Sequence, residues 1–173
     1  IMKETIKHFS NIGIKDIPLV GGKNASLGEM YSALSSKGIL VPEGFAITTV
    51  GYWDFLKENN LVEKLNFILA KLDIKTFDNL AEVGLEARNL LLGASLPTIL
   101  QKEIIVAFQK LNSNTGNNKS FAVRSSATAE DLPNASFAGQ QETYLNVKGE
   151  ENLLKACVRC YASLFTDRAI KYR

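Results

Sequence analysis

The stretch Ile17-Pro-Leu-Val-Gly-Gly-Lys-Asn-Ala-Ser-Leu-Gly-Glu-Met-Tyr-Ser-Ala-Leu34 sets the architecture expected for the N-terminal part of the chain. Its first four residues, 17–20, are apolar and predict a strand or an extended segment that two glycines end. After the glycines, apolar side chains recur at the i, i+3, i+4 and i+7 spacing of one helix face, at Leu27, Met30, Tyr31 and Leu34. We therefore expect a strand, a glycine turn and an amphipathic helix, in this order.

The residues after this helix predict a second strand, so that residues 17–48 are predicted to form a β-α-β unit. Gly38 stands where a left-handed residue would end the helix, and Pro42 marks a loop before the apolar segment 45–48. Three more helices are predicted by apolar stripes, at Leu61, Leu65, Ile68, Leu69 and Leu72; at Leu80, Val83, Ala87 and Leu91; and, after Pro97, at Leu100, Ile104, Ala107, Phe108 and Leu111.

The C-terminal part of the sequence predicts two strands that flank one long loop. We expect strands at 120–125 and 142–147, and the small residues, proline and glycine between them predict a loop at 126–139. A substantial helix should follow at 153–165. Thr166 is placed to cap a further helix, which we expect to be cut short at the C-terminus.

Length, composition and charge limit the class of protein. The 173 residues suffice for one domain, or for two small subdomains that share a core. A net charge of +2, from 20 basic and 18 acidic residues, argues for neither nucleic acid nor a membrane surface as a partner. The apolar stretches are short and interrupted by charges, and the N-terminus lacks the apolar segment of a signal peptide, so a cytoplasmic location is the default expectation.

Two cysteines, Cys157 and Cys160, form the only C-x-x-C pair. A tetrahedral zinc site would need two more ligands, which a chain with one histidine and no other cysteine can hardly supply. The alternative is a redox motif. Because the pair falls within an apolar helical pattern, reduced thiols in the core are the favoured interpretation.

The segment Gly21-Gly22-Lys23 has the composition of an anion-binding turn. Glycines ahead of a helix let backbone N–H groups approach an anion, and the helix N-terminus adds partial positive charge, while Lys23 would supply a mobile charge. The spacing around the glycines and the following Asn24 exclude a Walker A loop. The alternative is a tight turn with a solvated lysine.

A second candidate phosphate ligand is Arg124, at the end of the apolar run 121–123 and directly before Ser125 and Ser126. On a strand its side chain shares a face with Ala122, and we expect its guanidinium near the core edge, where bidentate pairing with phosphate offsets desolvation. The alternative is a salt bridge to an acidic neighbour such as Glu130 or Glu142.

The segment 135–143 ends a loop with glycine, two amides and a hydroxyl, at Gly139, Gln140, Gln141 and Thr143. This is the composition of a flap that hydrogen-bonds phosphate through its backbone and side chains. A hairpin-like connection whose polar residues face water is the alternative.

No nucleophilic triad is predicted, because the only histidine, His8, is far in sequence from the serine pair.

Several motifs together resemble the phosphoenolpyruvate synthase and pyruvate phosphate dikinase family, which also includes rifampicin phosphotransferases and glucan water dikinases. They are Val20–Met30 with Val41–Phe45, Phe121–Asp131, Ser136–Thr143 and Ala162–Arg173. The resemblance extends from about Asn11 to Arg173. The residues 24–30 look like those of the synthases, whereas 48–52 also suit the rifampicin enzymes.

The resemblance implies an α+β protein, the first subdomain of an ATP-grasp fold with a mixed or antiparallel sheet and packed helices. Residues 1–173 would form the N-terminal part of the ATP-binding domain. The motifs match two catalytic, phosphate-contacting residues, Lys23 and Arg124, and an ATP-binding set of Gly22, Lys23, Arg124, Ser125, Gly139, Gln140 and Thr143. Magnesium is the implied cofactor, with its acidic ligands expected beyond Arg173, so no metal ligand is assigned to this chain.

For a whole enzyme, the resemblance implies that ATP, pyruvate and water give phosphoenolpyruvate, AMP and phosphate through a phosphorylated histidine. The implied partners are ATP and the rest of the polypeptide: a second ATP-grasp subdomain, a phosphohistidine domain and a pyruvate-binding barrel. This chain alone is expected to be inactive. The alternatives are the ATP-binding part of a rifampicin phosphotransferase and a non-catalytic ATP-grasp remnant that acts as a binding module.

Overall fold

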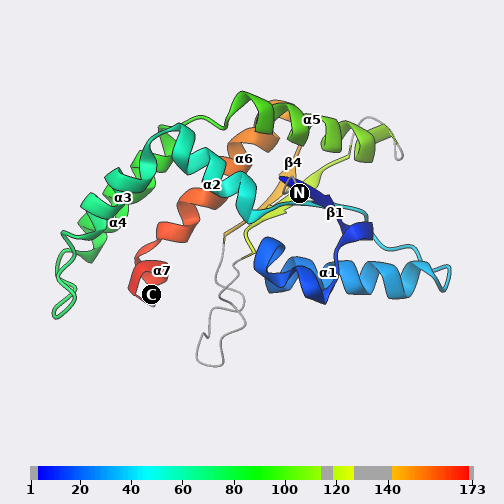
Figure 1. The fold of residues 1–173 in the computed structure, drawn as a ribbon, viewed down its shortest axis with the longest axis horizontal. Coiled ribbons are helices and arrows are strands. Elements are labelled where there is room, and N and C mark those ends of the chain that lie inside the picture. Colours follow the sequence, from blue (N-terminus) through cyan, green and yellow to red (C-terminus); the bar gives the residue numbers. More distant parts are fainter. Residues whose placement is uncertain (1–3, 114–118, 127–141, 172–173) are drawn as a thin grey trace. The chain divides into compact units, whose positions relative to one another are not determined.

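Two groups of segments, each with its own contacts, make up the structure, a computed structural model that describes residues 4–113, 119–126 and 142–171 (Figure 1). The first unit comprises Ile1–Trp53, Thr98–Lys119 and Ser126–Gln140, and the second comprises Asp54–Pro97, Ser120–Ser125 and Gln141–Arg173. Helix α2 (Thr49–Glu58) contributes residues to both. Helices and short antiparallel strands occur in each unit, which makes the chain an α+β protein.

The first unit is built on a two-stranded antiparallel sheet. Strand β1 (Ile6–His8) pairs with β2 (Phe45–Ile47), and helix α5 (Thr98–Ser113) contacts β1. The 3-10 turns η1 (Phe9–Asn11) and η2 (Ile14–Asp16) connect β1 to helix α1 (Ile17–Ser35). The buried core beside α1 consists of Ile12, Val20, Ala25 and Ala46.

The expected strand at 17–20 is wrong, because these residues form the first turn of α1. Pro18 lies in this turn, where the fixed φ of proline suits a helix and its missing N–H costs nothing. A run of four apolar residues fits a buried helical turn as well as a strand. The predicted strand at 45–48 corresponds to β2, and it pairs with β1, a strand that the sequence did not indicate.

The second unit packs helices against a two-stranded hairpin. Strands β3 (Phe121–Arg124) and β4 (Thr143–Val147) pair antiparallel, and helix α6 (Glu150–Ala162) contacts both. Helix α4 (Leu80–Leu92) contacts α3 (Leu61–Leu69), which lies beside it in Figure 1, and also α6. Both predicted strands and the predicted helices of this part are confirmed, whereas α2 was not expected.

The predicted cap residue, Thr166, precedes the last helix of the described chain. Turn η3 (Ser163–Phe165) leads into helix α7 (Asp167–Lys171), where the Thr166 hydroxyl accepts the N–H of Ala169 at 3.2 Å. The Arg88 guanidinium of α4 holds this junction by donating to the Phe165 carbonyl at 2.9 Å and to the Asp167 carboxylate at 3.1 Å. No helix in the described part of the chain is long and apolar enough to cross a membrane.

The cysteine pair lies in the core of the second unit, as expected. Cys157 and Cys160 are buried on α6 and form no disulfide. Burial raises the pKa of each thiol to about 12, so both stay protonated at neutral pH. Protonated, buried thiols are poor nucleophiles and poor metal ligands, which agrees with a structural role.

Candidate phosphate-binding segments

The glycine pair of the first unit interrupts helix α1. Gly21 has φ +80° and ψ 164°, outside the helical region, and the helix resumes directly after it. Gly21 thus stands at the N-cap position of the helical segment 22–35. Gly21 and Gly22 are buried and Lys23 is half-buried. This arrangement is the glycine turn that the sequence predicted, with a helical turn in front of it.

A serine from far along the chain lies against this turn. The backbone N–H of Asn24 donates to the Ser126 hydroxyl at 3.4 Å, across 102 positions of sequence. A Cβ built on Gly21 would lie 2.3 Å from the Ser126 hydroxyl oxygen and 2.6 Å from its carbonyl oxygen. The sequence did not predict this contact, although a glycine pair allows the backbone of another segment to approach closely.

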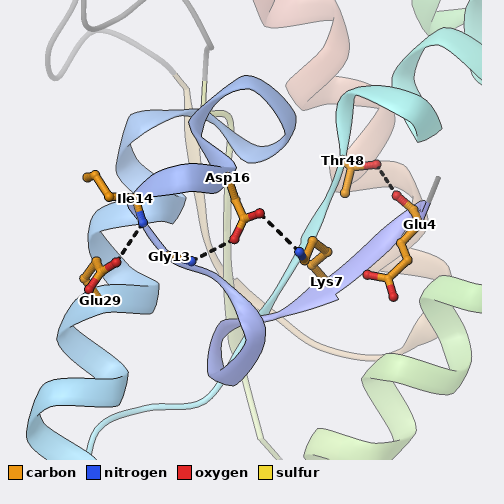
Figure 2. A network of polar contacts seen from close by, with 7 residues as sticks. All are labelled: Glu4, Lys7, Gly13, Ile14, Asp16, Glu29 and Thr48. Atoms are coloured by element: carbon orange, nitrogen blue, oxygen red, sulfur yellow. Dashed lines mark hydrogen bonds and ion pairs between the residues drawn. The ribbon is translucent and has the colours of Figure 1, made fainter. Parts of the chain in front are cut away.

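Carboxylates anchor the chain on both sides of the glycine turn (Figure 2). Before it, the buried Asp16 accepts the Gly13 N–H at 2.9 Å and pairs with the Lys7 ammonium at 3.3 Å. After it, Glu29 of α1 accepts the Ile14 N–H at 2.7 Å. The η2 turn is therefore tied both to β1 and to the helix that carries Lys23.

The Asp16 carboxylate should make folding dependent on pH. The hydrogen bond from the Gly13 N–H, together with the Lys7 ammonium, lowers the pKa of Asp16 against the opposing effect of burial. A group with a lowered folded pKa stabilises the fold above its unfolded pKa of about 3.9, and this contribution is lost as the pH falls through the folded value. Asp16→Asn should therefore cost about 1–2 kcal/mol of unfolding free energy at pH 7 and less near pH 2.

Urea unfolding at several pH values measures this difference, and the exposed Asp54 of α2, as Asp54→Asn, is the matched control. The control should leave the unfolding free energy within about 0.5 kcal/mol of the parent at every pH. An Asp16→Asn deficit that does not shrink in acid would contradict the role of the charge.

In the second unit, the strand pairing brings Arg124 opposite Thr143. The neighbouring pair is Val123 with Tyr144, so one face of the hairpin carries two half-buried side chains and the other carries Arg124 and Thr143, both exposed. Arg124 shares its face with Ala122, as expected. Its expected position near the core edge is wrong, because this face of the hairpin is the exposed one.

The proposed salt-bridge partners of Arg124 are Glu130 and Glu142. Glu130 lies outside the described residues, and within them no ion pair joins Arg124 to Glu142. Ser125, the next residue after Arg124, is half-buried.

The predicted ATP-binding set therefore falls into three groups. Gly22 and Lys23 lie together on α1 in the first unit, and Arg124, Ser125 and Thr143 lie together on the hairpin side of the second. Gly139 and Gln140 lie outside the described residues. Among residues 4–113, 119–126 and 142–171, no group of three or more His, Cys, Asp or Glu side chains could hold a metal ion.

Known proteins match nearly the whole chain. The family model of the pyruvate phosphate dikinase AMP/ATP-binding domain matches residues 17–173. The phosphoenolpyruvate synthase of Neisseria meningitidis serogroup B is 51% identical over 166 residues, which are 95% of this chain and 21% of that protein. Those of Synechocystis and Escherichia coli K12 are 49% and 46% identical, over 99% and 95% of this chain and 22% and 21% of their own lengths.

The chain thus spans about a fifth of the length of the curated relatives it matches. The resemblance inferred from the sequence motifs is confirmed by the family model and by these identities. The chain belongs to the family of the pyruvate phosphate dikinase AMP/ATP-binding domain.

Proposed function

We propose that this chain is the front part of the ATP-binding domain of a phosphoenolpyruvate synthase and that it binds the phosphates of ATP. The observation that carries the proposal is the family match over residues 17–173, together with the phosphoenolpyruvate synthases of Neisseria meningitidis, Synechocystis and Escherichia coli that the chain resembles. The alternative acceptor, rifampicin, has no support from these relatives. An assay of the intact protein with pyruvate and with rifampicin separates the two.

The local geometry of the glycine turn supports phosphate binding. A helix that begins at Gly22 directs its first N–H groups and the positive end of its dipole toward the turn, which favours an anion there. Because Gly22 has no side chain, a phosphate could approach its backbone closely. Lys23, in the first turn of the same helix segment, would add a full positive charge.

The hairpin of the second unit would supply the other contacts. Arg124 presents a planar guanidinium on an exposed strand face, where its fork can pair with two phosphate oxygens, and Thr143 adds a hydroxyl beside it. We assign Ser125, Gly139 and Gln140 to the same task. In this proposal Lys23 and Arg124 neutralise the charge that develops on the transferred phosphates, which is the main contribution of protein groups to such a transfer.

The proposal extends to the whole enzyme. Residues 1–173 would form the first subdomain of a cytoplasmic ATP-grasp enzyme, with the second subdomain, the phosphohistidine domain and the pyruvate barrel on the rest of the polypeptide. The family resemblance implies that the acidic magnesium ligands would lie there as well. The reaction would convert ATP, pyruvate and water into phosphoenolpyruvate, AMP and phosphate, and this chain alone would not turn over.

Calorimetric titration of the intact protein with magnesium ATP tests the site assignment. Lys23→Ala and Arg124→Ala should each weaken binding about 10- to 100-fold, because a hydrogen bond to a charged group contributes about 1.5–3 kcal/mol. Two exposed residues of the same types, as Lys37→Ala and Arg159→Ala, are matched controls and should leave the affinity unchanged. Unchanged affinity in both Lys23→Ala and Arg124→Ala would refute the assignment.

A further inference from the structure

The helix segment that begins at Gly22 lacks a side-chain cap of its own. At an N-cap, the side-chain oxygen of Ser, Thr, Asp or Asn normally accepts the N–H of the second or third helical residue. The residue in this position is Gly21, which has no side chain, and the third residue after it is Asn24. The Asn24 N–H nevertheless has a hydroxyl acceptor, because Ser126 reaches it from 102 positions away. Ser126 therefore caps this helix segment although it lies in another part of the chain.

The glycine and the serine depend on each other. With a φ of +80°, Gly21 adopts a conformation that side-chain-bearing residues rarely take. Any Cβ there would also fall 2.3 Å from the Ser126 hydroxyl oxygen, 2.6 Å from its carbonyl oxygen and 2.8 Å from its carbonyl carbon. The hydroxyl can therefore cap the helix only while position 21 has no side chain.

We propose that Ser126 is a positioning residue for phosphate binding, which caps the helix at Gly22 and holds its first N–H groups in the orientation that a phosphate requires. The inference rests on the proposed ATP-binding function and adds a residue to it. Ser126 is not a direct phosphate ligand in this proposal. It acts through the backbone of Gly22, Lys23 and Asn24.

Two features favour a role in binding over one in stability alone. The hydroxyl bonds the Asn24 N–H at the helix end where the phosphate is proposed to bind, so a change in this bond acts on the adjacent amides of Gly22 and Lys23. The distance of 3.4 Å is long for a hydrogen bond, so the hydroxyl contributes little to the fold as a whole. Removal of the hydroxyl should therefore affect phosphate binding more than folding.

The test uses three variants of the intact protein and two ligands, ATP and adenosine, in calorimetric titrations. Ser126→Ala removes the hydroxyl, Ser126→Cys replaces it with a weak acceptor of similar size, and Ser126→Thr keeps it. We expect the Ala and Cys variants to bind ATP about 3- to 10-fold more weakly, because the first N–H groups of the helix are then no longer held in the orientation that a phosphate requires. The Thr variant should stay closer to the parent, and the affinity for adenosine, which has no phosphate, should be unchanged in all three.

The outcomes separate the two proposals. An intact parent protein that fails to bind ATP would overturn the proposed function, and the role of Ser126 with it. Normal binding by the parent with unchanged ATP affinity in Ser126→Ala would overturn the role of Ser126 alone. Equal losses for ATP and adenosine would assign Ser126 to the fold and also overturn the positioning role. If Ser126→Ala does not fold, as seen from its thermal unfolding, the Cys and Thr pair makes the same comparison.

Discussion

Gly21→Ala is expected to lower the free energy of unfolding by about 2–6 kcal/mol and to abolish ATP binding at the glycine turn. Alanine at the observed φ of +80° and ψ of 164° costs about 1–3 kcal/mol. Its Cβ would also meet the Ser126 hydroxyl and backbone at 2.3–2.8 Å, and such overpacking typically costs a further ~1–3 kcal/mol. The backbone must shift to relieve this contact, and the amides of Gly22 and Lys23 shift with it. Urea unfolding and titration with ATP measure the two effects.

A substitution at a second glycine separates the conformational cost of alanine from the cost of its contact with Ser126. Gly38 also has a positive φ, +74°, but nothing lies within 4 Å of a Cβ built on it. Gly38→Ala should therefore show the conformational cost alone, about 1–2 kcal/mol, with normal ATP affinity. Equal losses in the two variants would show that the close approach of Ser126 to Gly21 has no energetic consequence.

Phe55→Ala in helix α2 is expected to destabilise the second unit by about 3–5 kcal/mol, the usual cost of removing a buried phenylalanine. The Phe55 side chain is 0% exposed, and its ring stacks on that of Tyr161 of α6, with centroids 5.2 Å apart and 26° between the planes. The truncation would leave a cavity beside the Tyr161 ring and remove an aromatic pair. Urea unfolding should show a lower midpoint with an unchanged m-value.

Phe67 of α3 provides the matched control, because it is the same residue type in the same unit but is 70% exposed. Its ring lies 5.0 Å from the Lys71 ammonium, a contact worth at most about 0.5–1 kcal/mol at an exposed site. Phe67→Ala should therefore cost less than about 1 kcal/mol. If the two substitutions cost the same, Phe55 would not be part of a packed core.

The helices of this protein could be predicted from the sequence because a helix face repeats over many residues. The apolar stripe predicted for 100–111 is the buried face of α5, with the same five residues. The shortest strands could not be predicted in this way. Strand β1 has only three residues and forms only because β2 pairs with it, and the four residues 17–20 fit a strand pattern but lie in a helix that Pro18 helps to start.

The candidate site was predictable to a similar extent. Glycines followed by a lysine, and an arginine at a strand end, are local features, and the resemblance to the family joined them into one hypothesis. The face on which Arg124 lies was predicted wrongly, since alternation along a strand defines two faces but does not say which one is covered. That depends on where the other elements pack.

The sequence by itself determined the family, the α+β class, the long helices and the glycine turn ahead of Lys23. Each of these depends on residues that are close together along the chain or on motifs that are shared with relatives. Only the tertiary structure decided that Asp16 is buried with Lys7, that Arg124 lies opposite Thr143 on an exposed face, and that Ser126 caps the helix at Gly22. The physical reason is that burial, strand pairing and a cap supplied from 102 residues away arise from contacts between distant segments, which no local pattern of side chains encodes.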